Sequence, residues 1–434
     1  MPRFQAPRGT RDLLPDVRTS FLRLEAVARD LAQRYGYQPI ETPLFELAEL
    51  FERGVGEVTD VVEKELFRVQ AGRGEAERER WALRPEPTAG IVRAYIEHGM
   101  RTWPQPVKLT TTGPMFRYDR PQAGRYRQFW QFDVEVIGDA GPGVDAEVIE
   151  LALAFFRGVG LGDVEVLLNS IGDGACRPAY VAVLADYFAR HPDGLPELER
   201  ARLAANPLRL LDSKDERMQP LIEAAPRMTD HLCSDCVGHF DGVKAHLAAL
   251  GIEARPAPTL VRGLDYYTRT AFEFYRPDAH GQQQALGGGG RYDGLVELLG
   301  GQATPGIGFG IGLDRVALAL AAHGPHLIEL PRPTVVVVSA DPDDTITRLR
   351  VATELRAAGL ACRPDLSARR LGKQLEGAAK AGAHLVVICG DEMSSGHVQV
   401  KDLQAGTQRQ VALADLGRDI LRAESQHRHG DEEG

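Results

Sequence analysis

The 434-residue sequence lacks the features of exported and membrane-spanning proteins. No apolar run approaches the roughly 18 residues that a helix needs to cross a bilayer. Residues 1–9 contain no apolar stretch ahead of a small-residue cleavage site. Cysteine is scarce, and the five that occur are scattered and odd in number, which excludes a disulfide framework. We therefore expect a cytoplasmic protein with no membrane partner.

The chain also lacks an excess of positive charge and the common nucleotide-binding motifs. A formal net charge of -10 argues against a protein that coats nucleic acid without discrimination, because that mode needs a broad excess of Lys and Arg. Neither G-x-x-x-x-G-K-[ST] nor a G-x-G-x-x-G that opens a helix after a strand occurs. A P-loop or Rossmann enzyme is disfavoured, so other groups must hold any nucleotide.

What the sequence does contain is an order of helices and strands typical of the α+β class. Apolar residues at helical spacing predict an amphipathic helix over residues 19–35, which Gly36 ends. Residues 37–45 contain two prolines and predict an extended piece at the edge of a sheet. Strand-like runs follow at residues 106–112, 126–137, 164–171, 270–275 and 305–311. This order predicts a mixed, largely antiparallel sheet flanked by helices.

Two shifts in composition divide the chain. Residues 176–255 favour helix and carry many charges, which predicts a helical insertion between two parts of a main domain, residues 1–175 and 256–328. After a proline-rich boundary, the alternation of strands and helices predicts a separate α/β domain over residues 332–424. Polar residues 425–434 predict a flexible tail.

Arginines are the candidate ligands for a nucleotide, because guanidinium forks suit triphosphates. Arg117 follows the strand-like residues 110–116, and Arg315 opens a helix after the glycine-alternating residues 306–312. Alternating glycine allows a ligand to come close, but it equally fits a strand packed on a neighbour with Arg315 in a surface ion pair. Residues 117–127 carry four arginines against one acid, and taken alone they favour a solvated charged hairpin.

A set of motifs runs in order along nearly the whole chain. The motifs are Arg8-Gly-Thr-Arg-Asp12, Leu83-Arg-Pro-Glu-Pro-Thr-Ala89, Phe116-Arg-Tyr-Asp-Arg-Pro-Gln122, Gly124-Arg-Tyr-Arg-Gln-Phe129, Val261-Arg-Gly-Leu-Asp-Tyr-Tyr-Thr268, Gly288-Gly-Gly-Arg-Tyr-Asp-Gly294 and Gly308 to Arg315. This set resembles the histidyl-tRNA synthetase family. The stretch from Arg262 to Tyr267 resembles its histidine-specific signature, whereas the second and third motifs of class II synthetases alone indicate only the class. Leu371-Gly-Lys-Gln374 and Val400-Lys-Asp-Leu403 resemble the family's anticodon-binding domain.

The resemblance implies a class II synthetase fold with a C-terminal α/β anticodon-binding domain. It implies an enzyme that activates L-histidine with ATP to histidyl-adenylate and pyrophosphate, and then transfers histidine to the 3' end of tRNA(His). ATP is a substrate that arrives with Mg²⁺, and no tightly bound organic cofactor is expected. A homodimer is also expected, because residues 19–45 resemble class II motif 1, whose extended segment pairs with a partner.

The resemblance assigns roles that these side chains can perform. Arg117 is expected on the α-phosphate of ATP, and Arg262 is expected to bridge the histidine carboxylate and that phosphate during attack. Further ATP contacts are expected from Asp119, Arg125 and Arg315. The residues expected around histidine are Glu86, Thr88 and Gln131 at the α-ammonium, Glu135 and Tyr267 at opposite imidazole nitrogens, and Tyr266 and Tyr292 along the pocket. Contacts to tRNA are expected from Gln122, Arg125, Arg369, Arg370 and Lys373.

Two positions depart from the family pattern. Pro87 stands where the family has glycine, which stiffens that loop, and Asp119 stands in place of glutamate, which shortens its reach. Taken alone, Glu135 or Tyr267 could be a satisfied interior residue.

Two other functions compete with that of a synthetase. A non-catalytic regulatory paralogue that partners ATP phosphoribosyltransferase resembles the catalytic domain only. A generic tRNA-binding or single-strand-binding module needs no histidine pocket.

A cysteine pair is the one candidate metal site in the sequence. Cys233-Ser-Asp-Cys236, with His231 and His239 nearby, resembles half of a zinc site. A structural zinc needs four ligands, and the sequence shows no second pair. We therefore expect no zinc, and instead a helix start in which Cys236 packs as a small apolar residue.

Overall fold

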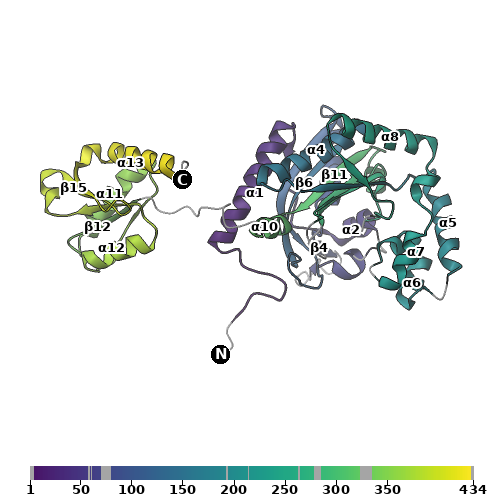
Figure 1. Ribbon diagram of the computed structural model, residues 1–434, viewed down its shortest axis with the longest axis horizontal. Helices are drawn as coiled ribbons and strands as arrows, with labels where there is room; N and C mark the ends of the chain where they lie inside the picture. The colour runs from purple at the N-terminus through teal and green to yellow at the C-terminus, as the bar shows by residue number, and fades with distance from the viewer. Residues whose placement is uncertain are drawn as a thin grey trace. The chain divides into compact units, whose positions relative to one another are not determined.

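The computed structural model describes residues 4–56, 59, 61–69, 80–191, 194–213, 215–261, 264–277, 285–322 and 335–431. The chain forms two compact units, Met1–Ile328 and Glu329–Gly434 (Figure 1). Among the described residues, no helix has the length and apolar character needed to cross a membrane.

The first unit is built on an eight-stranded sheet in the order β1-β5-β6-β11-β10-β9-β7-β8. The strands are β1 (Gln38–Pro39), β5 (Val107–Phe116), β6 (Gln128–Ile137), β7 (Glu165–Ser170), β8 (Ala254–Pro256), β9 (Thr268–Tyr275), β10 (Ala285–Arg291) and β11 (Gly306–Gly312). Neighbours are antiparallel except at the two edges, where β1 pairs with β5 and β8 with β7 in parallel. The expected mixed, largely antiparallel sheet is confirmed. A smaller sheet consists of β2 (Phe45–Leu47), β4 (Trp81–Leu83) and β3 (Arg68–Val69).

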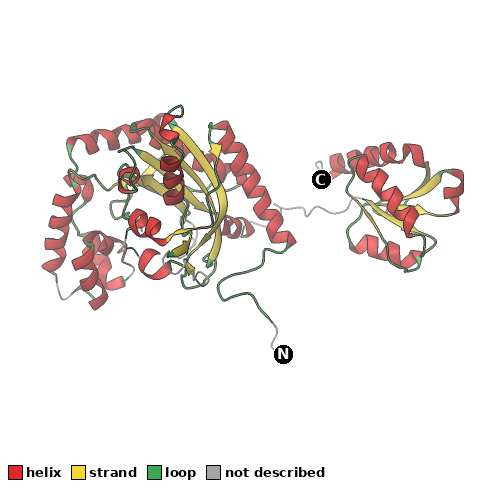
Figure 2. Ribbon diagram, turned by 180° about the vertical axis from the view of Figure 1, so that it is seen from behind, coloured by secondary structure: helices red, strands yellow, loops and turns green. Residues whose placement is uncertain are grey.

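Helices lie on both sides of this sheet, as Figure 2 shows. They are α1 (Pro15–Arg34), α2 (Ala48–Val55), α3 (Thr88–Glu97), α4 (Pro142–Val159), α9 (Leu295–Leu298) and α10 (Leu313–Ala321). Helix α1 buries Phe21, Leu24, Ala28 and Ala32, whose spacing places them on one face of the helix. It begins four residues before the predicted start because proline is well suited to the first turn, where its missing N–H costs no helical hydrogen bond.

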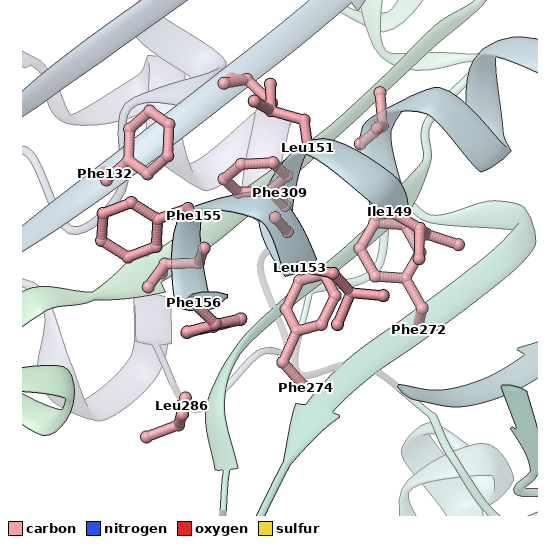
Figure 3. Packing of buried hydrophobic residues seen from close by; sticks show 14 of the residues in the cluster. Phe132, Ile149, Leu151, Leu153, Phe155, Phe156, Phe272, Phe274, Leu286 and Phe309 are labelled. Atoms are coloured by element: carbon pink, nitrogen blue, oxygen red, sulfur yellow. The ribbon is translucent and has the colours of Figure 1, made fainter. Parts of the chain in front are cut away.

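The core under one face of the sheet is apolar and aromatic. Strands β6 and β11 contribute alternate residues to it, namely Phe132, Val134, Val136, Ile307, Phe309 and Ile311. Figure 3 shows the ring of Phe132 near those of Phe155 on α4 and Phe309 on β11. The ring centroids of Phe155 and Phe309 lie 5.1 and 5.3 Å from that of Phe132. Since strand residues alternate between faces, the intervening residues of β6 and β11 point away from this core.

Strand β10 was not predicted from the sequence. Its run of glycines reads as a loop by composition, because glycine is poor at forming strands. In the fold it lies between β9 and β11. A Cβ atom at Gly289 would lie 2.0 Å from the carbonyl oxygen of Gly308, so the close approach of the two strands requires glycine there.

The predicted helical insertion is present between β7 and β9. It contains α5 (Arg177–Ala189), α6 (Glu197–Ala205), α7 (Gln219–Glu223) and α8 (Ser234–Ala249). Tyr180, Leu184, Phe188, Leu210 and Met218 are among the residues that form its own apolar core. Figure 1 shows α5, α6 and α7 gathered at one side of the first unit.

The second unit has a five-stranded sheet in the order β13-β12-β14-β15-β16. The strands are β12 (Val335–Ser339), β13 (Cys362–Pro364), β14 (Leu385–Cys389), β15 (His397–Asp402) and β16 (Gln408–Ala412), and the helices are α11 (Thr345–Ala357), α12 (Leu371–Lys380) and α13 (Leu416–Asp431). Every residue of β12 and β14 is buried, and each face of the sheet has a separate core. Helix α13 continues to Asp431, so residues 425–431, which belong to the predicted tail, are helical in the structure.

Candidate active site

The floor of the candidate site is the pairing of β6 with β11. Gly308 lies opposite Glu135, Gly310 opposite Asp133 and Gly312 opposite Gln131. A Cβ atom at Gly308 would lie 2.0 Å from a carboxylate oxygen of Glu135, and one at Gly310 would lie 2.7 Å from a carboxylate oxygen of Asp133. The alternating glycines therefore provide the room that the polar side chains of β6 occupy.

A pocket with about 1090 Å³ of empty space, including its open mouth, lies over these strands. Its size suits a ligand as large as a nucleotide with an amino acid. The predicted site residues that line it are Glu86, Thr88, Arg117, Asp119, Arg125, Gln131, Glu135, Tyr266, Tyr267, Tyr292 and Arg315. Gln122 is not part of the lining, and the position of Arg262 lies outside the described residues.

Glu86 is buried at the start of α3. Its carboxylate accepts hydrogen bonds from the backbone N–H groups of Thr88 and Ala89, at 2.8 and 3.0 Å. These are the first amides of the helix, which have no helical partner and favour a negative group. Pro87 precedes them with helical backbone angles, so proline fits the turn that carries Glu86 and Thr88. Burial raises the pKa of Glu86, although the hydrogen bonds and the charge of Arg117 oppose that rise.

Glu135 lies at the deepest part of the polar wall, with 1 % of its surface exposed. It accepts a hydrogen bond from the Thr88 hydroxyl at 2.6 Å and another from the Tyr292 hydroxyl. Burial raises the pKa of Glu135 to about 8, against the effect of the two hydrogen bonds. Burial and the neighbouring Glu135 raise the pKa of Tyr292 well above its ordinary value, so Tyr292 remains a hydroxyl donor.

Asp133 belongs to the same wall and was missed in the sequence. Burial, together with the negative charges of Glu135 and Glu86, raises its pKa well above the ordinary value. Among the described residues, Asp133 Oδ2 and Gln131 Oε1 are buried without a hydrogen-bond partner. Buried acceptors of this kind call for a donor from a ligand. The alternation of polar residues at 131, 133 and 135 in a strand was the signal that could have identified Asp133.

Arginines also line the pocket. The Nε of Arg117 donates to the Pro85 carbonyl at 2.9 Å, and its guanidinium lies 5.4 Å from the centre of the Phe129 ring. These contacts fix the side chain while its terminal nitrogens hydrogen-bond to no described residue. Arg315, in the first turn of α10, donates to the Ala285 carbonyl at 2.6 Å. Arg117 and Arg315 thus line the same pocket as the buried carboxyl groups of Glu86, Asp133 and Glu135.

A short hairpin carries the remaining predicted contacts of the first unit. The backbones of Gln122 and Arg125 bond to each other across a turn in which Gly124 has a φ of +74°. Arg125 pairs with Asp119 at 2.8 Å, so these two expected ATP ligands contact each other. The pairing is partly exposed and can exchange for a phosphate.

The other predicted tRNA contacts lie in the second unit. Arg369 and Arg370 are exposed just before α12, and Lys373 is exposed in its first turn. Arg369 pairs with Asp365 at 2.9 Å and Lys373 with Glu376 at 2.7 Å. Exposed pairs of this kind contribute little to stability and leave a basic surface.

The raised pKa of Glu135 predicts how stability depends on pH. Glu135 binds its proton more tightly in the folded protein than in the unfolded chain. The folded protein therefore loses stability as the pH rises from 4.5, the ordinary pKa of the group, to about 8, its raised pKa. A Glu135→Gln variant has no proton to lose. The melting temperature of the variant minus that of the wild type, both measured without histidine, should increase between pH 5.5 and pH 8.5. A difference that stays constant over this range, or shrinks, would contradict the raised pKa.

Comparisons with known proteins cover almost the whole chain. A family model described as histidyl-tRNA synthetase matches residues 9–316, and one described as anticodon binding domain matches residues 334–422. The histidine–tRNA ligase of Desulforudis audaxviator is 49% identical over 411 residues, which are 94% of this chain and 96% of the relative.

Solved structures show the same likeness. The crystal structure of apo S. aureus histidyl-tRNA synthetase matches with a TM-score of 0.80 and 34% identity, covering 96% of this chain and 100% of that one. A Bacillus halodurans structure described as an ATP phosphoribosyltransferase regulatory subunit/histidyl-tRNA synthetase matches with a TM-score of 0.64. Its identity is 22% over 90% of this chain and 99% of that one, so it shows a shared fold alone.

Proposed function

The chain belongs to the histidyl-tRNA synthetase family and is a histidine–tRNA ligase, and we propose that the pocket over β6 and β11 is where it activates histidine. The family implies ATP and Mg²⁺ as substrates and tRNA(His) as the acceptor. One observation carries the proposal: two buried acceptors without a donor, Gln131 Oε1 and Asp133 Oδ2, line the same pocket as the arginines Arg117 and Arg315. That arrangement suits a cationic amino acid joined to a polyphosphate.

Histidine would occupy the acidic side of the pocket. Glu86, Thr88 and Gln131 would accept the α-ammonium group, and the nearby Asp133 adds a further acceptor. Glu135 and Tyr267 would bond opposite nitrogens of the imidazole, while Tyr266 and Tyr292 line the walls. An isosteric side chain without ring nitrogens would lose both of these hydrogen bonds and would leave the buried Glu135 with only the hydroxyl groups of Thr88 and Tyr292 as partners, which is costly. Selectivity for histidine follows from that cost.

The phosphates of ATP would lie on the basic side. Arg117 would hold the α-phosphate and Arg315 the γ-phosphate, while Arg125 would help to hold the outgoing pyrophosphate and Asp119 would contact ATP. A carboxylate oxygen of histidine attacks the α-phosphorus, and the bond from that phosphorus to the bridging oxygen breaks. Arg262 is proposed to lie between the two anions as they approach, since their repulsion needs a positive charge.

The second step transfers histidine to the 3' end of tRNA(His). We assign residues 1–175 and 256–328 to the catalytic domain, 176–255 to the helical insertion and 332–424 to anticodon binding. Gln122 and Arg125 would contact the acceptor end of tRNA. The exposed Arg369, Arg370 and Lys373 would contact tRNA phosphates, which requires no base-specific geometry.

We further propose a homodimer in the cytoplasm. Leu44, Phe45 and Leu47 follow the edge strand β1 and are 41 %, 50 % and 48 % exposed. Apolar side chains grouped on an extended segment favour burial against a second copy of the chain. None of the five cysteines, all within the described residues, forms a disulfide, which fits a reducing compartment.

A matched pair of glycine variants tests the histidine site. A methyl group at Gly310 would lie 2.7 Å from Asp133 Oδ1 and 2.9 Å from Gln131 Nε2, whereas one at Gly312 meets only ordinary contacts at 3.7 Å and beyond. Gly310→Ala should raise the KM for histidine in ATP–pyrophosphate exchange about 10- to 100-fold, as overpacking by a methyl group costs about 1–3 kcal/mol.

The KM for ATP should change little in Gly310→Ala, and Gly312→Ala should behave as the wild type. A Gly310→Ala enzyme with an unchanged KM for histidine would place the amino acid elsewhere. The wild-type assay also discriminates among functions, because a regulatory paralogue or a plain tRNA-binding module would show no histidine-dependent exchange.

A further inference from the structure

Four potential metal ligands converge where the helical insertion meets the large sheet. Asp173 and Cys176 lie between β7 and α5, and Cys233 and Cys236 lie at the start of α8. Their ligand atoms are all within 4.8 Å of one another. The two segments are 60 residues apart in the sequence, and each contributes two ligands separated by two residues.

The distances fit tetrahedral coordination of zinc. Cys176 Sγ is 3.8 Å from Cys236 Sγ and 3.6 Å from Asp173 Oδ1, and Cys233 Sγ is 3.9 Å from the same oxygen. Zinc bonds of about 2.3 Å to sulfur and about 2.0 Å to oxygen place tetrahedral ligand atoms about 3.5–3.8 Å apart. A disulfide needs its sulfur atoms at about 2.05 Å, so the cysteine spacing suits a shared ion.

The surroundings suit a closed, structural site. Cys176 and Cys236 are 5 % and 1 % exposed within the apolar core of the insertion, while Cys233 and Asp173 are half-buried and leave a route for an ion. Cys176 immediately precedes α5 and Cys233 immediately precedes α8. Each ligand pair is therefore held by backbone at the start of a helix.

Asp173 is also held in a ligating orientation. Its second oxygen, Oδ2, accepts hydrogen bonds from the Arg269 guanidinium at 3.3 and 3.4 Å, so Oδ1 is the oxygen nearest the sulfur atoms. Outer partners that orient a ligating carboxylate in this way are a regular part of metal sites. The nearby histidines lie elsewhere: His239 bonds Asp145 at 2.9 Å, and His231 stacks near Tyr180.

We propose that Asp173, Cys176, Cys233 and Cys236 bind one Zn²⁺ ion that fastens the insertion to the catalytic sheet. From the sequence we expected no zinc because no second pair of ligands was found. Asp173 and Cys176 provide that second pair. The ion would also brace the histidine pocket. Arg177, next to Cys176, donates to the backbone carbonyl of Tyr267, and Arg269, which holds Asp173, lies two residues after Tyr267.

Metal analysis of the full-length protein, purified without chelators or a polyhistidine tag, tests the proposal. The wild type should retain about one zinc ion per chain through dialysis. Cys176→Ser and Cys233→Ser should each weaken zinc retention by at least about ten-fold against a chelator. Cys362→Ser, which removes a buried cysteine of the second unit, should retain the wild-type zinc content.

Two further measurements do not depend on whether the serine variants fold. Cobalt(II) added to the zinc-free wild type should give the visible bands of a tetrahedral site and thiolate-to-cobalt charge transfer. Asp173→Cys, which completes a four-cysteine site, should raise that charge-transfer intensity by about one third and bind zinc more tightly. A wild type that binds neither ion, or a count of three free thiols indicating a Cys176–Cys236 disulfide, would overturn the proposal.

Discussion

Histidine-dependent ATP–pyrophosphate exchange should fall by about two to three powers of ten in an Arg117→Ala variant. Arg117 lines the pocket with its Nε fixed on the Pro85 carbonyl, so the guanidinium is already oriented before ATP arrives. Charge on the α-phosphate increases as the histidine carboxylate approaches, and a preorganised cation stabilises that charge without reorganising. The loss should therefore appear in kcat for adenylate formation.

Arg120 provides the matched control. It lies three residues further along, is exposed and does not line the pocket, so Arg120→Ala makes the same change of charge without touching the phosphate. Its exchange rate should stay near that of the wild type. Arg117→Lys should recover only part of the lost rate, because an ammonium group keeps the charge but not the planar fork. Exchange at the wild-type rate in Arg117→Ala would exclude Arg117 as the α-phosphate ligand.

The sequence predicted those parts of the fold that depend on local patterning. Strands β5 and β6 alternate apolar and polar residues, and α1 spaces its apolar residues as a helix does. Strand β10 has no such pattern. Gly289 must be glycine because the backbone of Gly308 on the neighbouring strand lies too close to leave room for a side chain. Which strands become neighbours is a long-range property, so β10 was not among the strands predicted from the sequence.

Some residues of the candidate site could be predicted from the sequence and others could not. Glu86 and Arg117 could be named because they lie in motifs with a recognisable family pattern, and Glu135 because the resemblance implies a role for it. Asp133 lies in no such motif, and its unpaired oxygen becomes visible only when the register places it against Gly310. The cysteine cluster is a sharper case, since its two halves are far apart in sequence and meet only through the folding of the insertion.

Removal of residues 329–434 should separate the two steps of the reaction. The second unit has its own cores on both faces of its sheet, and the pocket is lined only by residues of the first unit. The truncated enzyme should therefore keep its exchange rate within about three-fold. Its kcat/KM for tRNA in aminoacylation should fall by at least about 100-fold, the equivalent of about 2.7 kcal/mol of lost tRNA binding.

A full-length variant shows whether that loss reflects charge contacts with tRNA. Between residues 363 and 380 five basic residues outnumber two acids, and Arg369, Lys373 and Lys380 pair with those acids. Arg363 and Arg370 are exposed and form no ion pair with a described residue, so they are the cations most available to phosphates. Arg363→Ala/Arg370→Ala should weaken tRNA binding and lower its salt slope by about 1.4–1.8, as loss of two phosphate contacts requires. An unchanged salt slope in the double variant would mean that the second unit binds tRNA through other groups. An equal loss of exchange and of aminoacylation in a folded truncated enzyme would refute the assignment of the two steps to different units.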